Sequence, residues 1–219
     1  MLVKKFVCHS KKVLDIARQY GWKAGARYTN LRDVRHEKSV GFLDIDWKNY
    51  NFEKHIAAAQ ITRPGLTVAQ DIVSIEMLPT ILGQAEHLLK FAKQVIVVPK
   101  DIKLSDNLLG HIPSKFILGY SVPTRYGGTE IPLNSFDGRP VHLLGGRPDV
   151  QRELANDLNV VSLDTNRFTL DASYGDYFDG KIFKPHPKGG YDTCIRASLN
   201  NMNKLWKTYR GPQSHTGRK

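Results

Sequence analysis

The chain has 219 residues, 41% of them hydrophobic, which is enough for one sizeable core, and we therefore expect a single domain spanning residues 1–219. The 32 Lys and Arg exceed the 21 Asp and Glu and give a net charge of +11, which favours a polyanionic partner, of which nucleic acid is the commonest. No apolar stretch is long enough to span a bilayer or to serve as a signal peptide, so we expect a cytoplasmic protein without a membrane partner.

Eight short apolar runs alternate with helical or loop segments along the chain. The runs cover residues 5–9, 24–29, 40–46, 66–72, 94–99, 116–122, 141–145 and 160–164. Apolar residues at helical spacing predict helices over 11–20, 52–61, 79–92 and 149–158. Such alternation is typical of a mostly parallel sheet with helices between the strands.

The number of runs predicts the α/β class, as a TIM-type (β/α)8 barrel in one compact domain. A doubly wound open sheet would alternate in the same way, but no Gly-rich phosphate loop follows the first strand. We expect residues 124–139 to form a functional loop over the barrel mouth. Residues 168–188 show no clear period, and residues 192–210 predict an amphipathic helix that closes the outer ring, within a C-terminal helix and basic tail over 190–219.

Carboxylates recur where the apolar runs stop. Asp44 and Asp46 end the third run, Asp71 ends the fourth and Asp164 ends the eighth. Alternation along a strand places Asp44 and Asp46 on the same face. Each could cap a helix or pair with an arginine, but carboxylates that converge on one barrel rim are typical of a catalytic site.

Glycines and a histidine accompany the carboxylates. Gly145 and Gly146 follow the seventh run, and Gly119 lies in the sixth, beside Tyr120. Glycine at a strand end lets backbone amides approach a flat ligand, although each glycine could simply permit a turn. His142, inside its run, is interpreted as a satisfied core or rim histidine rather than a metal ligand.

Three motifs in sequence carry a resemblance to a known family. The motifs are Leu-Gly-Tyr-Ser-Val-Pro at 118–123, His-Leu-Leu-Gly-Gly-Arg-Pro at 142–148 and Val-Ser-Leu-Asp-Thr-Asn at 161–166. The helix predicted over 149–158 separates the second motif from the third. Together with Phe-Leu-Asp at 42–44, they resemble the tRNA-guanine transglycosylase superfamily in order and spacing over residues 40–166. Ile-Asp-Trp replaces that family's Ser-Gly-Gly after the first of its aspartates.

Two departures narrow the resemblance. The tRNA enzymes carry a Cys-rich zinc subdomain, whereas this chain has two cysteines, Cys8 and Cys194, without metal-ligand spacing. The chain is also much shorter. In both respects the chain resembles the compact phage branch of the superfamily, which exchanges guanine in DNA for a 7-deazaguanine. Membership of that branch would imply a protein that acts in the host cytoplasm and needs no metal or cofactor.

The resemblance implies a DNA-guanine transglycosylase that works through a covalent aspartyl-glycosyl intermediate. Asp164 would be the nucleophile, and Asp44 would be the proton carrier, with Asp46 as its substitute. The base would be bound by Gln70, Asp71, Gly119, Tyr120, Ser121, Gly145, Gly146 and Asn166. The charge pattern places the nucleic-acid backbone on Arg125, Arg147, Arg167, Lys204, Lys207 and Arg210.

Two alternatives stay open at this point. The chain could be a catalytically inactive nucleic-acid-binding or targeting subunit of a DNA-modification system, in which Asp164 is structural. It could also be a sugar-phosphate isomerase or aldolase-like barrel, although the sequence shows no convincing lysine or phosphate loop for one. The residues do not distinguish DNA from RNA, single from double strands, or a monomer from a homodimer, and they do not identify the 7-deazaguanine derivative.

Overall fold

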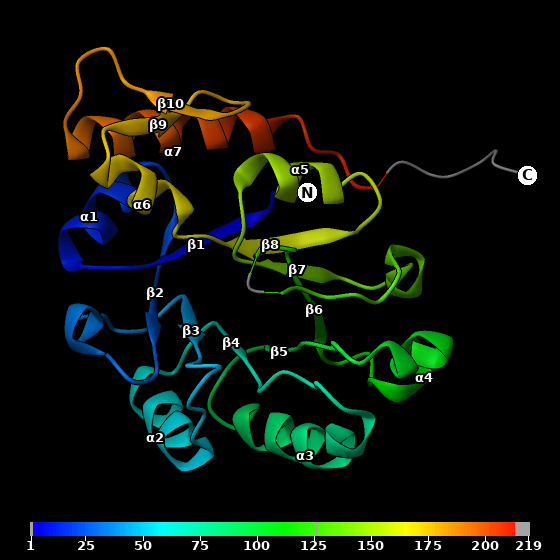
Figure 1. The fold of residues 1–219 in the computed structure, drawn as a ribbon. Helices are drawn as coiled ribbons and strands as arrows, with labels where there is room; N and C mark the ends of the chain where they lie inside the picture. Colours follow the sequence, from blue (N-terminus) through cyan, green and yellow to red (C-terminus); the bar gives the residue numbers. More distant parts are fainter. Residues whose placement is uncertain (1, 126, 213–219) are drawn as a thin grey trace, which may run out of the picture.

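A closed barrel of eight parallel strands, arranged in chain order, forms the centre of the molecule (Figure 1). This computed structural model describes residues 2–125 and 127–212. The expected (β/α)8 fold is therefore confirmed, and each apolar run overlaps one strand. The strands are β1 (Lys4–Cys8), β2 (Lys23–Arg27), β3 (Phe42–Asp44), β4 (Leu66–Val68), β5 (Val95–Val97), β6 (Ile117–Ser121), β7 (Val141–Leu144) and β8 (Val160–Asp164).

Packed side chains in the middle of the barrel divide its lumen into two ends. Phe6 of β1 packs against Phe42 of β3 with ring centroids 5.5 Å apart, and Phe42 stacks on His142 of β7 at 5.2 Å. All three residues are buried. Since alternate residues of a strand face the same side, Lys4 and Cys8 lie toward the amino and carboxyl ends of the lumen on either side of Phe6.

Six helices connect or follow the strands, and a long helix completes the outer layer. The four helices predicted from apolar spacing are present, and α4 and α6 were not predicted. The helices are α1 (Lys11–Gln19), α2 (Phe52–Thr62), α3 (Leu78–Leu88), α4 (Leu108–His111), α5 (Pro148–Leu154), α6 (Arg167–Ser173) and α7 (Tyr191–Lys207).

An unpredicted hairpin lies between α6 and α7. Strands β9 (Asp176–Phe178) and β10 (Phe183–Pro185) pair antiparallel and pack with α6 and α7 outside the barrel (Figure 1). Residues 124–139, expected as a loop over the barrel mouth, follow β6 and contain a short 3₁₀ helix, Leu133–Phe136. No helix among residues 2–125 and 127–212 is long and apolar enough to cross a membrane.

The end of α7 lies beside the amino end of β8. The Tyr209 hydroxyl donates to the Leu158 carbonyl at 3.0 Å and accepts from the Val160 amide at 2.8 Å. The last turn of α7 is therefore at the opposite end of the barrel from Asp164. The basic residues at 217–219 fall outside the described part of the chain.

Candidate active site at the carboxyl end of the barrel

A pocket of 590 Å³ opens at the carboxyl ends of the strands. This is the end at which TIM barrels carry their catalytic residues. The lining comes from β2, β3, β4, β6, β7 and β8 and from the loops that follow the strands. Its polar and glycine members include Arg27, Asp44, Asp46, Asp71, Lys100, Ser121, Gly145, Gly146 and Asp164.

One carboxylate oxygen of Asp164 is held by two donors. His142 Nε2 lies 3.2 Å from Asp164 Oδ1, and the Gly145 amide donates to the same oxygen at 3.4 Å. The side chain is 13% exposed, so the carboxylate still reaches the pocket. Anchoring Oδ1 in this way leaves Oδ2 as the oxygen presented to a ligand.

His142 connects Asp164 to Ser162 inside the lumen. Its Nδ1 lies 2.8 Å from Ser162 Oγ, and its ring stacks on Phe42. With the Ser162 hydroxyl donating to Nδ1, Nε2 is the ring nitrogen that donates a hydrogen bond to the Asp164 carboxylate. His142 is thus a buried, hydrogen-bonded histidine, as the sequence suggested, but one that positions a pocket carboxylate.

The carboxyl group of Asp44 titrates near neutral pH. Burial and the nearby negative charge of Asp164 raise the pKa of Asp44 to about 7, against the lowering effects of the Ile45 amide and Arg27. The Ile45 amide donates to Asp44 Oδ1 at 2.8 Å. Asp44 therefore carries a proton in about half of the molecules near neutral pH, as a general acid–base group requires.

Lysine and arginine side chains also reach this pocket, and the sequence analysis missed them. Lys100 Nζ forms an ion pair with Asp71 Oδ2 at 2.7 Å, and Arg27 pairs with Asp44 in the register of β2 with β3. The expectation that no suitable lysine exists is therefore wrong. Lys100 follows the fifth apolar run and Arg27 ends β2, so the rule that found the aspartates could have found both.

Cys8 is a further pocket neighbour that the sequence did not single out. Burial, reinforced by the negative charges of Asp44 and Asp164, raises the pKa of its thiol well above the ordinary value. A thiol held protonated in this way is a poor nucleophile. We therefore assign the chemistry to the carboxylates.

The Gly145–Gly146 pair shapes the wall of the pocket next to Asp164. Gly146 has a φ of +79°, and a Cβ there would lie 2.4 Å from Val122 Cγ1, so the turn requires glycine. Gln151 of α5 fixes the same turn by donating to the Gly145 carbonyl at 2.6 Å and to the Asp164 carbonyl at 2.9 Å. The backbone beside the nucleophile candidate is thereby rigid.

Four residues expected to bind the base do not line the pocket, namely Gly119, Tyr120, Gln70 and Asn166. Gly119 lies in the packed interior, where a Cβ would be 2.6 Å from Val98 Cγ2 and 2.7 Å from Ile96 Cγ2. Its role is close packing, because the lumen has no room for a side chain there. Tyr120 packs against Phe136 with ring centroids 5.4 Å apart, and Gln70 is also outside the pocket lining.

The other base-binding candidates lie closer to the rim. Asp71 and Ser121 line the pocket, as do Gly145 and Gly146, and Asp46, the substitute proton carrier, lines it too. Asn166 instead lines a neighbouring 440 Å³ cavity above β1 and β2, where its Oδ1 accepts from the Cys8 amide at 3.2 Å. Asn166 therefore positions the end of β1 rather than contacting the pocket.

Two of the arginines expected to bind a nucleic-acid backbone, Arg147 and Arg167, are paired with carboxylates. Arg147 makes two bonds to Asp149 at 3.0 and 3.1 Å, and Arg167 makes two to Asp171 at 2.5 and 2.8 Å. Both guanidinium groups also lie within 6.0 Å of the Phe183 ring centre. A phosphate would have to compete with these carboxylates for them.

The C-terminal cations are at the wrong end for a substrate bound over Asp164. Lys204 and Lys207 occupy the last turns of α7, and Arg210 donates to the Lys207 carbonyl at 2.7 Å. Tyr209 fixes this segment at the amino end of β8. Arg125 is exposed and lies in the segment that follows β6, beyond Ser121. The rim itself contributes three cations, Arg27, Lys48 and Lys100.

No cluster of three or more His, Cys, Asp or Glu that could hold a metal ion occurs within residues 2–125 and 127–212. Of the rim carboxylates, Asp71 forms an ion pair with Lys100, and Asp164 Oδ1 lies 3.2 Å from His142 Nε2.

Comparison with known proteins relates the chain to a family and to a structure. Residues 17–207 match a family described as "Family of unknown function (DUF6610)". The YdjI aldolase from Escherichia coli K12 is similar in structure, with a TM-score of 0.55 and 11% sequence identity over 95% of this chain and 92% of that chain. This identity supports the barrel fold alone. A search of curated proteins gives no match. The family match covers most of the sequence, and the chain therefore belongs to the DUF6610 family.

Proposed function

We propose that this protein is a base-exchange transglycosylase that replaces guanine in DNA with a 7-deazaguanine. The observation that carries the proposal is the pair of unlike carboxylates at one barrel mouth. Asp164 has one oxygen anchored and the other presented, while the pKa of Asp44 is raised to about 7. Retaining glycosyl transfer needs such a pair, with one nucleophile and one proton carrier.

The first step breaks the bond between base and sugar. Asp164 Oδ2 attacks the anomeric carbon, and the bond to guanine N9 breaks with its electrons passing to the base. Protonated Asp44 supplies the proton that the departing guanine takes up. The products are free guanine, an Asp44 carboxylate and an ester between Asp164 and the deoxyribose.

The second step reverses the first with a different base. The 7-deazaguanine gives its N9 proton to Asp44 and attacks the anomeric carbon through N9, which breaks the ester to Asp164. Both carboxyl groups return to their starting states. The target nucleotide has to leave the duplex stack for its sugar to reach Asp164, since the pocket lies below the rim.

Trp47 and Lys48 offer a surface for an extruded nucleotide. Trp47 lines the pocket yet is 55% exposed, and Lys48 Nζ lies 5.2 Å from its ring centre. An exposed indole can stack on a base, and a neighbouring ammonium can contact its phosphate. Asp71, oriented by Lys100, is the side chain of the pocket best suited to accept hydrogen bonds from the edge of guanine.

The experiment mixes the protein with guanine-containing DNA and a labelled 7-deazaguanine and measures label in the DNA. Wild type should incorporate label and form a covalent protein–DNA adduct visible by denaturing electrophoresis. Asp164→Asn should do neither, because an amide keeps the shape but is not a nucleophile. Its DNA affinity should stay within a few-fold of wild type, which controls for folding.

Three outcomes would count against this proposal. Incorporation by Asp164→Asn at the wild-type rate would move the nucleophile to another residue. DNA binding without exchange by wild type would favour the targeting subunit. Exchange into RNA but not DNA would change the substrate class.

Lys100 supports a second candidate function. A lysine in a barrel-mouth pocket can form a Schiff base with a carbonyl substrate, which is one route to carbon–carbon bond cleavage. Its Nζ lies 2.7 Å from Asp71 Oδ2, and the amine would have to leave this ion pair to reach a carbonyl carbon. Borohydride treatment with short aldehydes and ketones tests this candidate, since a stable mass increase on Lys100 would support it and an unchanged mass would leave the transglycosylase.

A further inference from the structure

A second and larger cavity occupies the opposite end of the barrel. It measures 840 Å³ and is lined by residues at or just before the amino ends of all eight strands. The Phe6, Phe42 and His142 layer separates it from the pocket around Asp164. This volume lies within the range of small-molecule sites, whereas this end of a TIM barrel is ordinarily a structural face.

The charge of this cavity is strongly positive. Five of its lining residues are cationic, and one, Glu37, is acidic (Lys4, Arg18, Lys23, Arg63 and Lys93 are the cations). Arg18 forms ion pairs with Glu37 and Asp15, so the single acid is already neutralised. By contrast, the pocket at the carboxyl end is lined by four aspartates and three cations.

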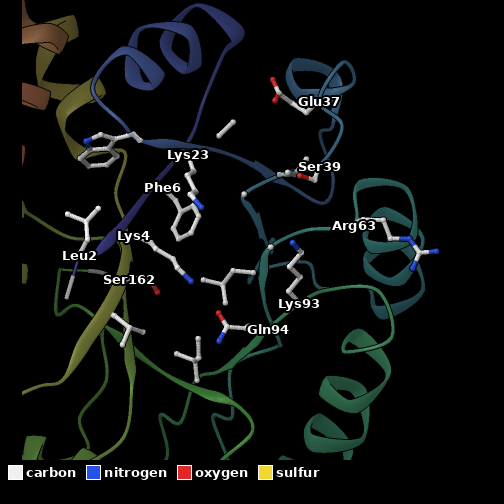
Figure 2. A pocket seen from close by; sticks show the side chains of 18 of the residues that line it. Leu2, Lys4, Phe6, Lys23, Glu37, Ser39, Arg63, Lys93, Gln94 and Ser162 are labelled. Atoms are coloured by element: carbon white, nitrogen blue, oxygen red, sulfur yellow. The ribbon is translucent and has the colours of Figure 1, made fainter.

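Three lysines of the cavity form no ion pair with a carboxylate of the described residues. Figure 2 shows Lys4 and Lys23 pointing into the cavity from β1 and β2, with Lys93 across from them. Within the part of the chain that the structure describes, no ion pair involves any of these three ammonium groups. Converging unpaired ammonium groups repel one another, and a bound anion would relieve that repulsion.

Neutral hydrogen-bonding groups complete the lining. The side chain of Gln94 points toward the same space, and the Ser162 hydroxyl lies at its inner end (Figure 2). Lysine binds phosphate as a compact point charge, and amide and hydroxyl groups bind the remaining oxygens.

We propose that this cavity binds a small organic phosphate, of the size and charge of a mononucleotide or a sugar bisphosphate. Lys4, Lys23 and Lys93 would neutralise the phosphate, and Gln94 would orient it. The site is separate from the proposed exchange reaction, since none of these residues lines the pocket around Asp164.

The test measures binding by titration calorimetry with inorganic pyrophosphate, guanosine monophosphate and ribose 5-phosphate at constant ionic strength. Wild type should bind at least one of them at least ten-fold more tightly than sulfate. Lys4→Gln with Lys23→Gln should weaken that binding at least ten-fold. The matched control is Lys54→Gln with Lys181→Gln, which removes the same charge from exposed sites outside the cavity and should change affinity less than two-fold.

The outcomes separate this site from the proposed function. Asp164→Asn should bind the phosphate like wild type, whether or not the protein exchanges bases. Affinity no better than for sulfate would overturn the proposal, as would equal losses in the two double variants. Binding of a 5′-phosphorylated oligonucleotide but of none of the small phosphates would also overturn it, in favour of a nucleic-acid surface.

Discussion

The protonation of Asp44 is the residue-level property with the most direct consequence for stability. Because the folded-state pKa of about 7 lies above the ordinary value of 3.8, the unfolded chain releases this proton first as the pH rises. The contribution of Asp44 to stability is therefore complete below about pH 4 and lost by about pH 7. The loss amounts to at most about 4 kcal/mol.

We predict that Asp44→Asn removes this pH dependence, since the amide does not ionise. Urea unfolding should show the variant to be more stable than wild type at pH 8, with a difference that shrinks toward pH 5. Asp137→Asn, at an exposed aspartate outside the pocket, serves as the control and should follow the wild-type curve. Parallel curves for wild type and Asp44→Asn would mean that Asp44 ionises normally.

His142 permits a prediction about positioning. Replacing it with leucine keeps an apolar side chain between Phe6 and Phe42 but removes the donor to Asp164 Oδ1. We expect kcat for base exchange to fall by roughly 10²-fold, because a nucleophile displaced by about 1 Å loses its alignment. KM should change little, because His142 does not line the pocket.

His142→Gln should recover part of that loss, since its amide nitrogen can again donate to Asp164. Steady-state kinetics on the two variants check this prediction. Equal activity in both would show that His142 only fills space.

The site residues that could be predicted are those whose position depends on the end of a strand. Asp44, Asp46, Asp71 and Asp164 meet because parallel strands in a barrel end on one rim. The bond between His142 and Asp164 was not predictable, since it depends on the register of β7 with β8 and on a side-chain conformation. The same limit applies to Gly119. A glycine in a strand does not by itself indicate close packing, and the side chains that crowd this position come from other strands.

At the scale of elements, the packed lumen leads to a third prediction. A Cβ on Gly119 of β6 would lie 2.6 Å from Val98 and 2.9 Å from Leu144. We expect Gly119→Ala to destabilise the protein by about 1–3 kcal/mol, because the filled interior cannot take another methyl group without strain.

Gly83 of α3 is the matched control for this substitution. Nothing lies within 4 Å of a Cβ added there, and alanine is a better helix former than glycine. Gly83→Ala should therefore leave stability unchanged or raise it by about 1 kcal/mol. The urea midpoints of the two variants check the direction of each change in unfolding free energy. An unchanged midpoint for Gly119→Ala would show that the barrel interior accommodates another methyl group without strain.

Elements with a strong period were predictable, and short ones were not. The buried strands appear as continuous apolar runs, and α7 has an apolar face along its length. The hairpin of β9 and β10 has three residues in each strand and packs on helices, so no alternation marks it. Helix α6 is also short, with seven residues. Its Phe168 and Thr169 are buried by tertiary packing, which the local sequence does not indicate.

At the scale of the whole molecule, the positive charge is not distributed as the sequence suggested. The net charge of +11 indicated a polyanion, but much of the charge lies around the amino end of the barrel and on the last turn of α7. The carboxylates lie at the other end. A DNA substrate over Asp164 would therefore depend on a few rim cations, of which Lys48 is exposed beside Trp47.

This arrangement leads to the last prediction, which concerns the salt dependence of DNA affinity. Each phosphate contact contributes about one unit to the slope of log affinity against log salt. Lys48→Ala should flatten that slope by about one unit. Arg147→Ala and Lys204→Ala should change the slope little. The Arg147 guanidinium is paired with Asp149, and Lys204 lies near the amino end of β8.

If Lys204→Ala flattened the slope and Lys48→Ala did not, DNA would bind at the end of the barrel away from Asp164, and the proposed exchange could not take place at Asp164. A slope of zero in wild type would remove nucleic acid as the partner.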